Sequence, residues 1–121
     1  MIKAFVNLFF PKVCYACHNS LGDNEDTICI DCRNDLPVTN FHFNDDESVI
    51  KVLYGRAKLE YGTALFRFEK KGPVQQLIHG LKYKGYEDIG FVLGNWLGGE
   101  LKDVDPYNTI DIIIPVPLHA K

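Results

Sequence analysis

Four cysteines stand as two pairs near the start of the chain, and this arrangement constrains the fold more than any other feature. The pairs are Cys14-x2-Cys17 and Cys29-x2-Cys32, with eleven residues between them. A two-residue gap lets two thiolates of one tight turn reach the same ion at about 2.3 Å, and two such turns complete a tetrahedron. The spacing therefore predicts a compact zinc ribbon with one Zn²⁺, which is structural because four thiolates leave no open coordination position.

Three other uses of four cysteines compete with zinc. Two disulfides are typical of secreted proteins, and nothing in the sequence indicates export. A redox Cys-x2-Cys centre normally occurs once, near a βαβ pattern that the cysteine region lacks. An iron–sulfur cluster can also use four cysteines, and the spacing alone does not exclude it. His18 directly follows Cys17, but four thiolates already saturate the ion, so we interpret His18 as a solvated loop residue.

The composition is that of an ordinary globular protein. The 121 residues are 46% hydrophobic and 24% charged, which suits one domain, or a small module attached to part of a larger one. The formal charge is −3, which disfavours a broad basic surface for nucleic acid. No apolar run approaches the ~20 residues that cross a bilayer. We therefore expect no membrane partner and a cytoplasmic location.

The first ten residues are strongly apolar, with one lysine, Lys3. A secretory signal needs a longer segment and a small-residue cleavage site, but Pro11 and Cys14 interrupt this one first. A membrane-surface anchor is an open alternative, although this segment lacks the Lys/Arg-rich polar face that such helices use. We expect a short helix whose aromatic face packs on the rest of the protein.

Residues 38–48 mix polar, acidic and aromatic side chains without a clear period, which indicates a linker with a boundary near residue 45. The sequence thus divides into a zinc-ribbon module, 1–45, and a second unit, 46–121. We interpret Asp45 and Asp46 as a solvated acidic loop, because no glycine-rich phosphate loop accompanies them as a magnesium site would require.

The second unit combines expected strands and helices. Residues 52–54 and 64–68 are β-rich runs punctuated by glycines. Pro73 suits the first turn of a helix that ends near Gly85, and a second helix is expected over 87–101. The first helix carries an apolar stripe at Val74, Leu77, Ile78 and Leu81. We expect both helices to fold on an apolar face separate from the zinc module.

The last expected element is a strand over Thr109–Ile114, ended by Pro115. Its continuous β-branched residues are typical of a strand buried on both faces in a parallel sheet. The expected fold class is therefore α/β, or α+β where the sheet is incomplete, because the residues that remain after this strand supply no parallel partner.

Three segments together resemble ComF-type proteins, which are predicted phosphoribosyltransferases associated with natural competence. These are the doubled cysteine pair, Leu81-Lys82-Tyr83-Lys84-Gly85, and the run from Asp111 to His119. The resemblance covers essentially the whole chain in the right order. It implies a type I phosphoribosyltransferase-like domain after the zinc ribbon, with Asp111–Pro117 as the first core strand. The loop that follows would lie near the pyrophosphate end of a phosphoribosyl pyrophosphate site.

The resemblance also indicates what this sequence lacks. Family members continue with an Asp-Asp…Thr-Thr-Gly loop, whose acidic pair meets the ribose hydroxyls and whose backbone cradles the 5′-phosphate. That loop is absent here, so the chain looks like an N-terminal portion without turnover of its own. Mg²⁺ and phosphoribosyl pyrophosphate would bind only in a full-length parent. Lys82, Lys84 and His119 are the candidate ligand-binding residues that the resemblance leaves in this chain.

Two functions are compatible with these features of the sequence. The first is a ComF-like phosphoribosyltransferase-family protein that acts in DNA uptake, competence or nucleotide metabolism. The alternative is a zinc-stabilised interaction module. Its partners would be proteins of the competence machinery or single-stranded DNA.

Overall fold

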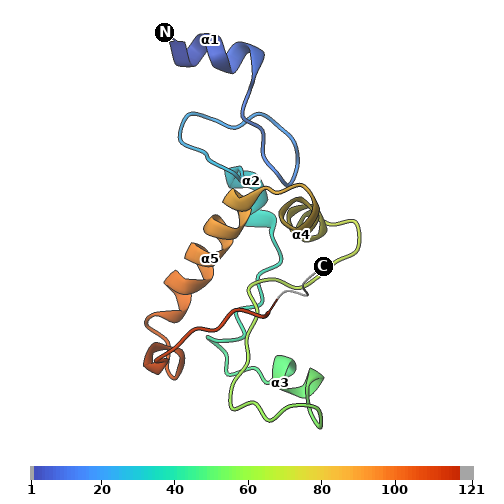
Figure 1. The fold of residues 1–121 in the computed structure, drawn as a ribbon, viewed down its shortest axis with the longest axis vertical. Coiled ribbons are helices and arrows are strands. Elements are labelled where there is room, and N and C mark those ends of the chain that lie inside the picture. Colours follow the sequence, from blue (N-terminus) through green and yellow to red (C-terminus); the bar gives the residue numbers. More distant parts are fainter. Residues whose placement is uncertain (1, 118–121) are drawn as a thin grey trace.

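A computed structural model describes residues 2–117, and its regular elements are helices (Figure 1). They are α1 (Ile2–Phe9), α2 (Ile30–Asp35), α3 (Ser48–Val52), α4 (Pro73–Tyr83), α5 (Glu87–Leu101) and the 3-10 helix η1 (Tyr107–Thr109). Among these residues, β-pairing is limited to isolated bridges at Val13–Ser20, Asp26–Ile28 and Val38–Phe66. The expected α/β sheet is therefore not formed within residues 2–117.

The two long helices confirm the predictions made for them. Pro73 occupies the first turn of α4, where its missing N–H leaves no hydrogen bond unmade. The chain leaves α4 through Gly85, whose φ of +69° is the left-handed conformation that glycine adopts without strain. Helix α5 then packs back against α4, and this pair buries Leu77 and Ile89 almost completely.

One core joins the cysteine loops to the helix pair. The buried cluster comprises Cys14, Ala16, Ile28, Cys29, Leu36, Val74, Leu77 and Ile89. Aromatic contacts at its edge connect the same parts, because the Tyr15 ring stacks on Tyr86 at 4.6 Å and Arg33 lies 4.8 Å over the Trp96 ring. The expectation that the helices fold on a separate apolar face is therefore wrong. The division into 1–45 and 46–121 stays a prediction.

Substitution by alanine should change the stability of the protein in opposite directions at two glycines of the helix pair. A Cβ added at buried Gly80 would lie 3.0 Å from Tyr86 Cδ2 and 3.2 Å from Ile89 Cδ1, so Gly80→Ala should destabilise the protein by about 1–3 kcal/mol. A Cβ at Gly94 would meet no described atom within 4 Å. Gly94→Ala should therefore stabilise α5 by roughly 1 kcal/mol through helix propensity. Urea unfolding of both variants measures the two signs, and equal signs would contradict the packing at Gly80.

The three expected strands are not formed in the structure. Residues 52–54 continue the end of α3. Residues 64–68 form one isolated bridge, between Phe66 and Val38, which is flanked by backbone hydrogen bonds of Leu65 and Arg67 to residues 37–39. Thr109 belongs to η1, and residues 110–117 form no regular element and are exposed, with Ile113 89% accessible. A strand needs a neighbouring strand for its backbone hydrogen bonds, and none of the described residues pairs with this segment.

Helix α1 also differs from its expected packing. It forms over the predicted residues, but Figure 1 shows it at one end of the molecule, apart from the other helices. Phe5 and Phe9 are 66% and 63% exposed, and their rings contact each other at 5.3 Å. The expectation that this aromatic face packs on the rest of the protein is therefore wrong for the described residues.

The expected linker is partly a packed segment. Thr39, Phe41 and His42 are buried. The backbone of this segment pairs locally with residues 65–67, since the Thr39 N–H donates to the Leu65 carbonyl at 3.0 Å. This pairing holds the segment after the second cysteine pair against the segment that leads into α4.

Candidate metal centre

The four cysteine Sγ atoms converge, although they come from two separate loops. All four lie within 4.8 Å of one another, and the Sγ atoms of Cys17 and Cys29 are 3.7 Å apart. Four sulfurs at 2.3 Å from one Zn²⁺ in a tetrahedron would lie about 3.8 Å from one another. The structure thus brings together the four predicted ligands, and the Cys17–Cys29 distance matches the separation that a tetrahedral ion requires.

The first loop is a tight turn that places Cys14 and Cys17. The His18 N–H donates to the Cys14 carbonyl at 2.8 Å, and the Cys14 N–H donates to the Asn19 carbonyl at 2.8 Å. His18 has a φ of 66° and an exposed side chain. Its prediction as a solvated loop residue is confirmed.

The second loop presents its cysteines from the start of α2. Cys29 is the N-cap of this helix, and its Sγ accepts the Cys32 N–H at 3.4 Å. The two loops are joined directly, because the Tyr15 N–H donates to the Thr27 carbonyl at 3.0 Å. The second pair therefore lies at a helix N-terminus, where the helix dipole favours negatively charged sulfur.

Backbone donors, burial and neighbouring thiols shift the pKa values of the cysteines. Burial raises the pKa of Cys14, but N–H groups of Cys29, Cys17 and Ala16 outweigh it and lower the pKa to about 7. The Cys29 and Ala16 donors lie 3.3 Å and 3.4 Å from the Cys14 sulfur. Burial, followed by the neighbouring thiols, raises the pKa of Cys32 well above its ordinary value. Cys14 is therefore partly ionised at neutral pH, and binding of a cation would displace the remaining thiol protons.

The donor set fits zinc in a structural role. Cys14 and Cys29 are buried, while Cys17 and Cys32 are partly exposed. Four soft thiolates around a tetrahedral position suit Zn²⁺ and complete its coordination, so no position is left for water or a substrate. The N–H···S hydrogen bonds are the outer-shell contacts that hold such ligands in orientation.

The other predicted site residues do not gather at this centre. Lys82 lies in the last turn of α4, Lys84 caps its end, and both side chains are exposed. His119 lies outside the described residues. Asp46 is engaged locally, because its carboxylate accepts the N–H of Ser48, the first residue of α3, at 2.8 Å. This contact and the exposure of Asp45 agree with the acidic loop that the sequence predicts.

One buried polar cluster, at His42, was not predicted from the sequence. The Nδ1 atom of His42 lies 2.8 Å from Thr63 Oγ1, and its Nε2 lies 3.4 Å from Glu100 Oε1. The contact connects the segment after the cysteine loops to the C-terminal half of α5. One feature of the sequence pointed to this burial. His42 stands between Phe41 and Phe43, and neighbouring phenylalanines favour a buried segment over a solvent-exposed one.

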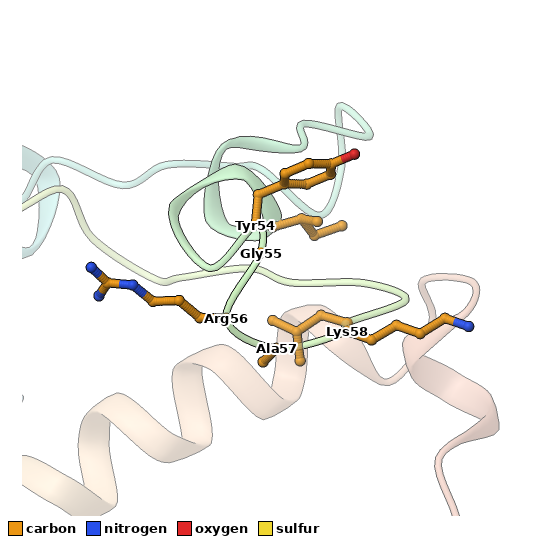
Figure 2. A pocket seen from close by; sticks show the side chains of 7 residues that line it. Tyr54, Gly55, Arg56, Ala57 and Lys58 are labelled. Atoms are coloured by element: carbon orange, nitrogen blue, oxygen red, sulfur yellow. The ribbon is translucent and has the colours of Figure 1, made fainter.

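A surface cavity beside α3 does not bring reactive groups together. It has a volume of about 470 Å³ and is lined by Ile50 and by residues 54–59. Figure 2 shows that the side chains of Arg56 and Lys58 extend in opposite directions, and Tyr54 is 84% exposed. Because its charged groups do not converge, the cavity provides no geometry for catalysis.

Comparisons of the chain with protein-family models, with curated proteins and with solved structures found no match. Within residues 2–117, no helix has both the length and the apolar character needed to cross a bilayer.

Proposed function

We propose that Cys14, Cys17, Cys29 and Cys32 bind one structural Zn²⁺ that holds the cysteine loops and the helix pair in one folded unit. The convergence of the four sulfurs inside the shared core carries this proposal. When bound, the ion supplies a fixed tetrahedral cross-link between two loops that bury little apolar surface of their own. A cluster of reduced thiols also favours the cytoplasm as the location.

The expected composition is one zinc per chain. Elemental analysis of the purified protein should give a molar ratio near one, and cobalt substitution should give the absorption of tetrahedral thiolate ligation. His18→Asn should leave both results unchanged, because His18 is exposed and four thiolates complete the site. Iron in place of zinc, or two disulfides without metal, would contradict the proposal.

We propose further that the chain is a ComF-like protein of the phosphoribosyltransferase family, with a role in DNA uptake, competence or nucleotide metabolism. The order of the three resembling segments carries this proposal. Two local features support it: the Lys-Tyr-Lys-Gly segment ends α4 through Gly85, and the mostly apolar segment Asp111–Pro117 is exposed and forms no regular element. An exposed β-branched segment of this kind suits a strand that belongs in a larger sheet.

Phosphoribosyl pyrophosphate should bind this chain no more tightly than about millimolar, even with Mg²⁺ present. The sequence has no phosphate-cradling loop, and residues 1–60 carry nine acidic against six basic side chains. This charge balance repels an anionic donor. Calorimetry measures the affinity directly. Micromolar binding by the 121-residue chain would contradict the prediction, and micromolar binding by a longer polypeptide from the same gene would support the family proposal.

A second candidate function is a zinc-stabilised interaction module for a competence-machinery protein or single-stranded DNA. The exposure of Ile112, Ile113 and Ile114 favours a protein partner, because contiguous exposed apolar side chains mark interaction surfaces. The formal charge of −3 disfavours DNA. Titration with a fluorescent oligonucleotide at low and high salt separates the two partners, since phosphate contacts produce a steep salt dependence.

A further inference from the structure

Helix α1 exposes an unusually broad apolar surface. Ile2, Phe5, Val6 and Phe9 follow the spacing i, i+3, i+4, i+7 and form one stripe, and all four are exposed. Leu8 and Phe10 flank this stripe on its two sides and are 74% and 77% exposed. The Phe10 N–H donates to the Val6 carbonyl at 2.7 Å, which continues the helical turn. At about 100° per residue, these positions span roughly 200° of the circumference.

We propose that α1 lies in the surface of a membrane that contains anionic lipids and docks the zinc-bearing body there. A helix in a protein groove buries a stripe about 100° wide, which would leave Leu8 and Phe10 in water. A helix lying in a bilayer interface buries about half of its circumference, which covers the whole apolar surface of α1.

The charges around α1 have the sign that anionic lipids attract. Lys3 and Lys12 are the only Lys, Arg, Asp or Glu residues in the first 22 positions, whereas the whole chain has a charge of −3. Charge is therefore segregated, with the positive end at the apolar helix. Two lysines are fewer than polybasic anchors carry, so the apolar side chains supply most of the binding and the lysines supply the lipid preference.

The length of α1 fixes how it meets the bilayer. Its eight residues are about 12 Å long, which is far short of the hydrocarbon core of about 30 Å. The helix therefore lies on the membrane instead of crossing it. Pro11 ends the helix, and Cys14 follows within the metal centre, so the short connection keeps the folded body beside the membrane surface.

Vesicle flotation of the full zinc-loaded chain tests this proposal. The protein should float with vesicles of equimolar phosphatidylcholine and phosphatidylglycerol, and bind phosphatidylcholine alone about 30-fold more weakly at low salt, since each lysine contributes a factor of about five. The double variant Phe5→Ser/Phe9→Ser should lose at least about 100-fold in binding. Circular dichroism and zinc content should match the unmodified protein, because the two rings contact each other and not the core.

A matched control is available in Phe68→Ser/Phe91→Ser, which removes two phenylalanines that are 64% and 71% exposed outside α1. This variant should bind the mixed vesicles like the unmodified protein. The proposal is overturned if the unmodified protein does not float, or if both double variants lose binding equally. It is also overturned if the unmodified protein stays in solution as a dimer that Phe5→Ser/Phe9→Ser dissociates, because a second copy would then cover α1.

Discussion

Replacing Cys29 with serine should unfold the cysteine loops and the helices α4 and α5 together. Cys29 is a proposed metal ligand and also a buried member of the cluster that contains Val74, Leu77 and Ile89. Structural zinc in small modules contributes on the order of 10 kcal/mol or more, which is comparable with the entire stability of a small domain, about 5–15 kcal/mol. Far-ultraviolet circular dichroism should therefore lose most of its helical signal, and elemental analysis should find no zinc.

Chelation and a matched variant make this result specific. A strong zinc chelator added to the unmodified protein should reproduce the loss of helical signal, and added zinc should restore it. His18→Asn changes the exposed residue beside Cys17, and asparagine tolerates the φ of 66° at this position, so this variant should keep both zinc and helices. If Cys29→Ser lost zinc but kept the signal of α4 and α5, the shared core would not couple the two parts.

The features that the sequence predicted well are those that local chemistry decides. The 3.6-residue apolar period and Pro73 define α4, and the two-residue gaps in the cysteine pairs bring thiols into one turn. Helix α2 was missed, although Cys29 starts it by accepting the Cys32 N–H. A cysteine at an N-cap carries no common sequence signal, because Ser, Thr, Asp and Asn are the residues that usually cap helices.

The wrong predictions concern contacts between distant segments. The β-branched residues of Thr109–Ile114 favour a strand, but strand formation requires a neighbour, which none of the described residues supplies. The prediction that the aromatic face of α1 packs on the rest of the protein also failed at this level. Hydrophobicity indicates that a surface favours burial, but it does not indicate which segment buries it. Likewise, no sequence period indicated that Leu77 would belong to the same buried cluster as Cys14 and Cys29.

The shared cluster of Leu77 and the cysteines leads to a second strong prediction, in which a substitution in α4 weakens metal binding. Leu77 is 1% exposed and belongs to the cluster that includes Cys14 and Cys29. Leu77→Ala should leave a cavity and lower the free energy of unfolding by about 2–5 kcal/mol. Where zinc binding and folding are one process, the same loss appears in the zinc affinity, so even 2 kcal/mol corresponds to about 30-fold weaker binding.

Competition with a chromophoric chelator measures the zinc affinity, and urea unfolding of the zinc-loaded protein measures the stability. Phe91→Ala is the control, because Phe91 lies on α5 with its side chain exposed and should change both quantities little. A Leu77→Ala protein with lower stability but unchanged zinc affinity would show that the loops bind metal without the helices. Equal losses of unfolding free energy and of zinc-binding free energy would instead mean that the four thiolates and the helix pair fold as one unit. A change in the stability of such a unit appears in full in its affinity for the ion.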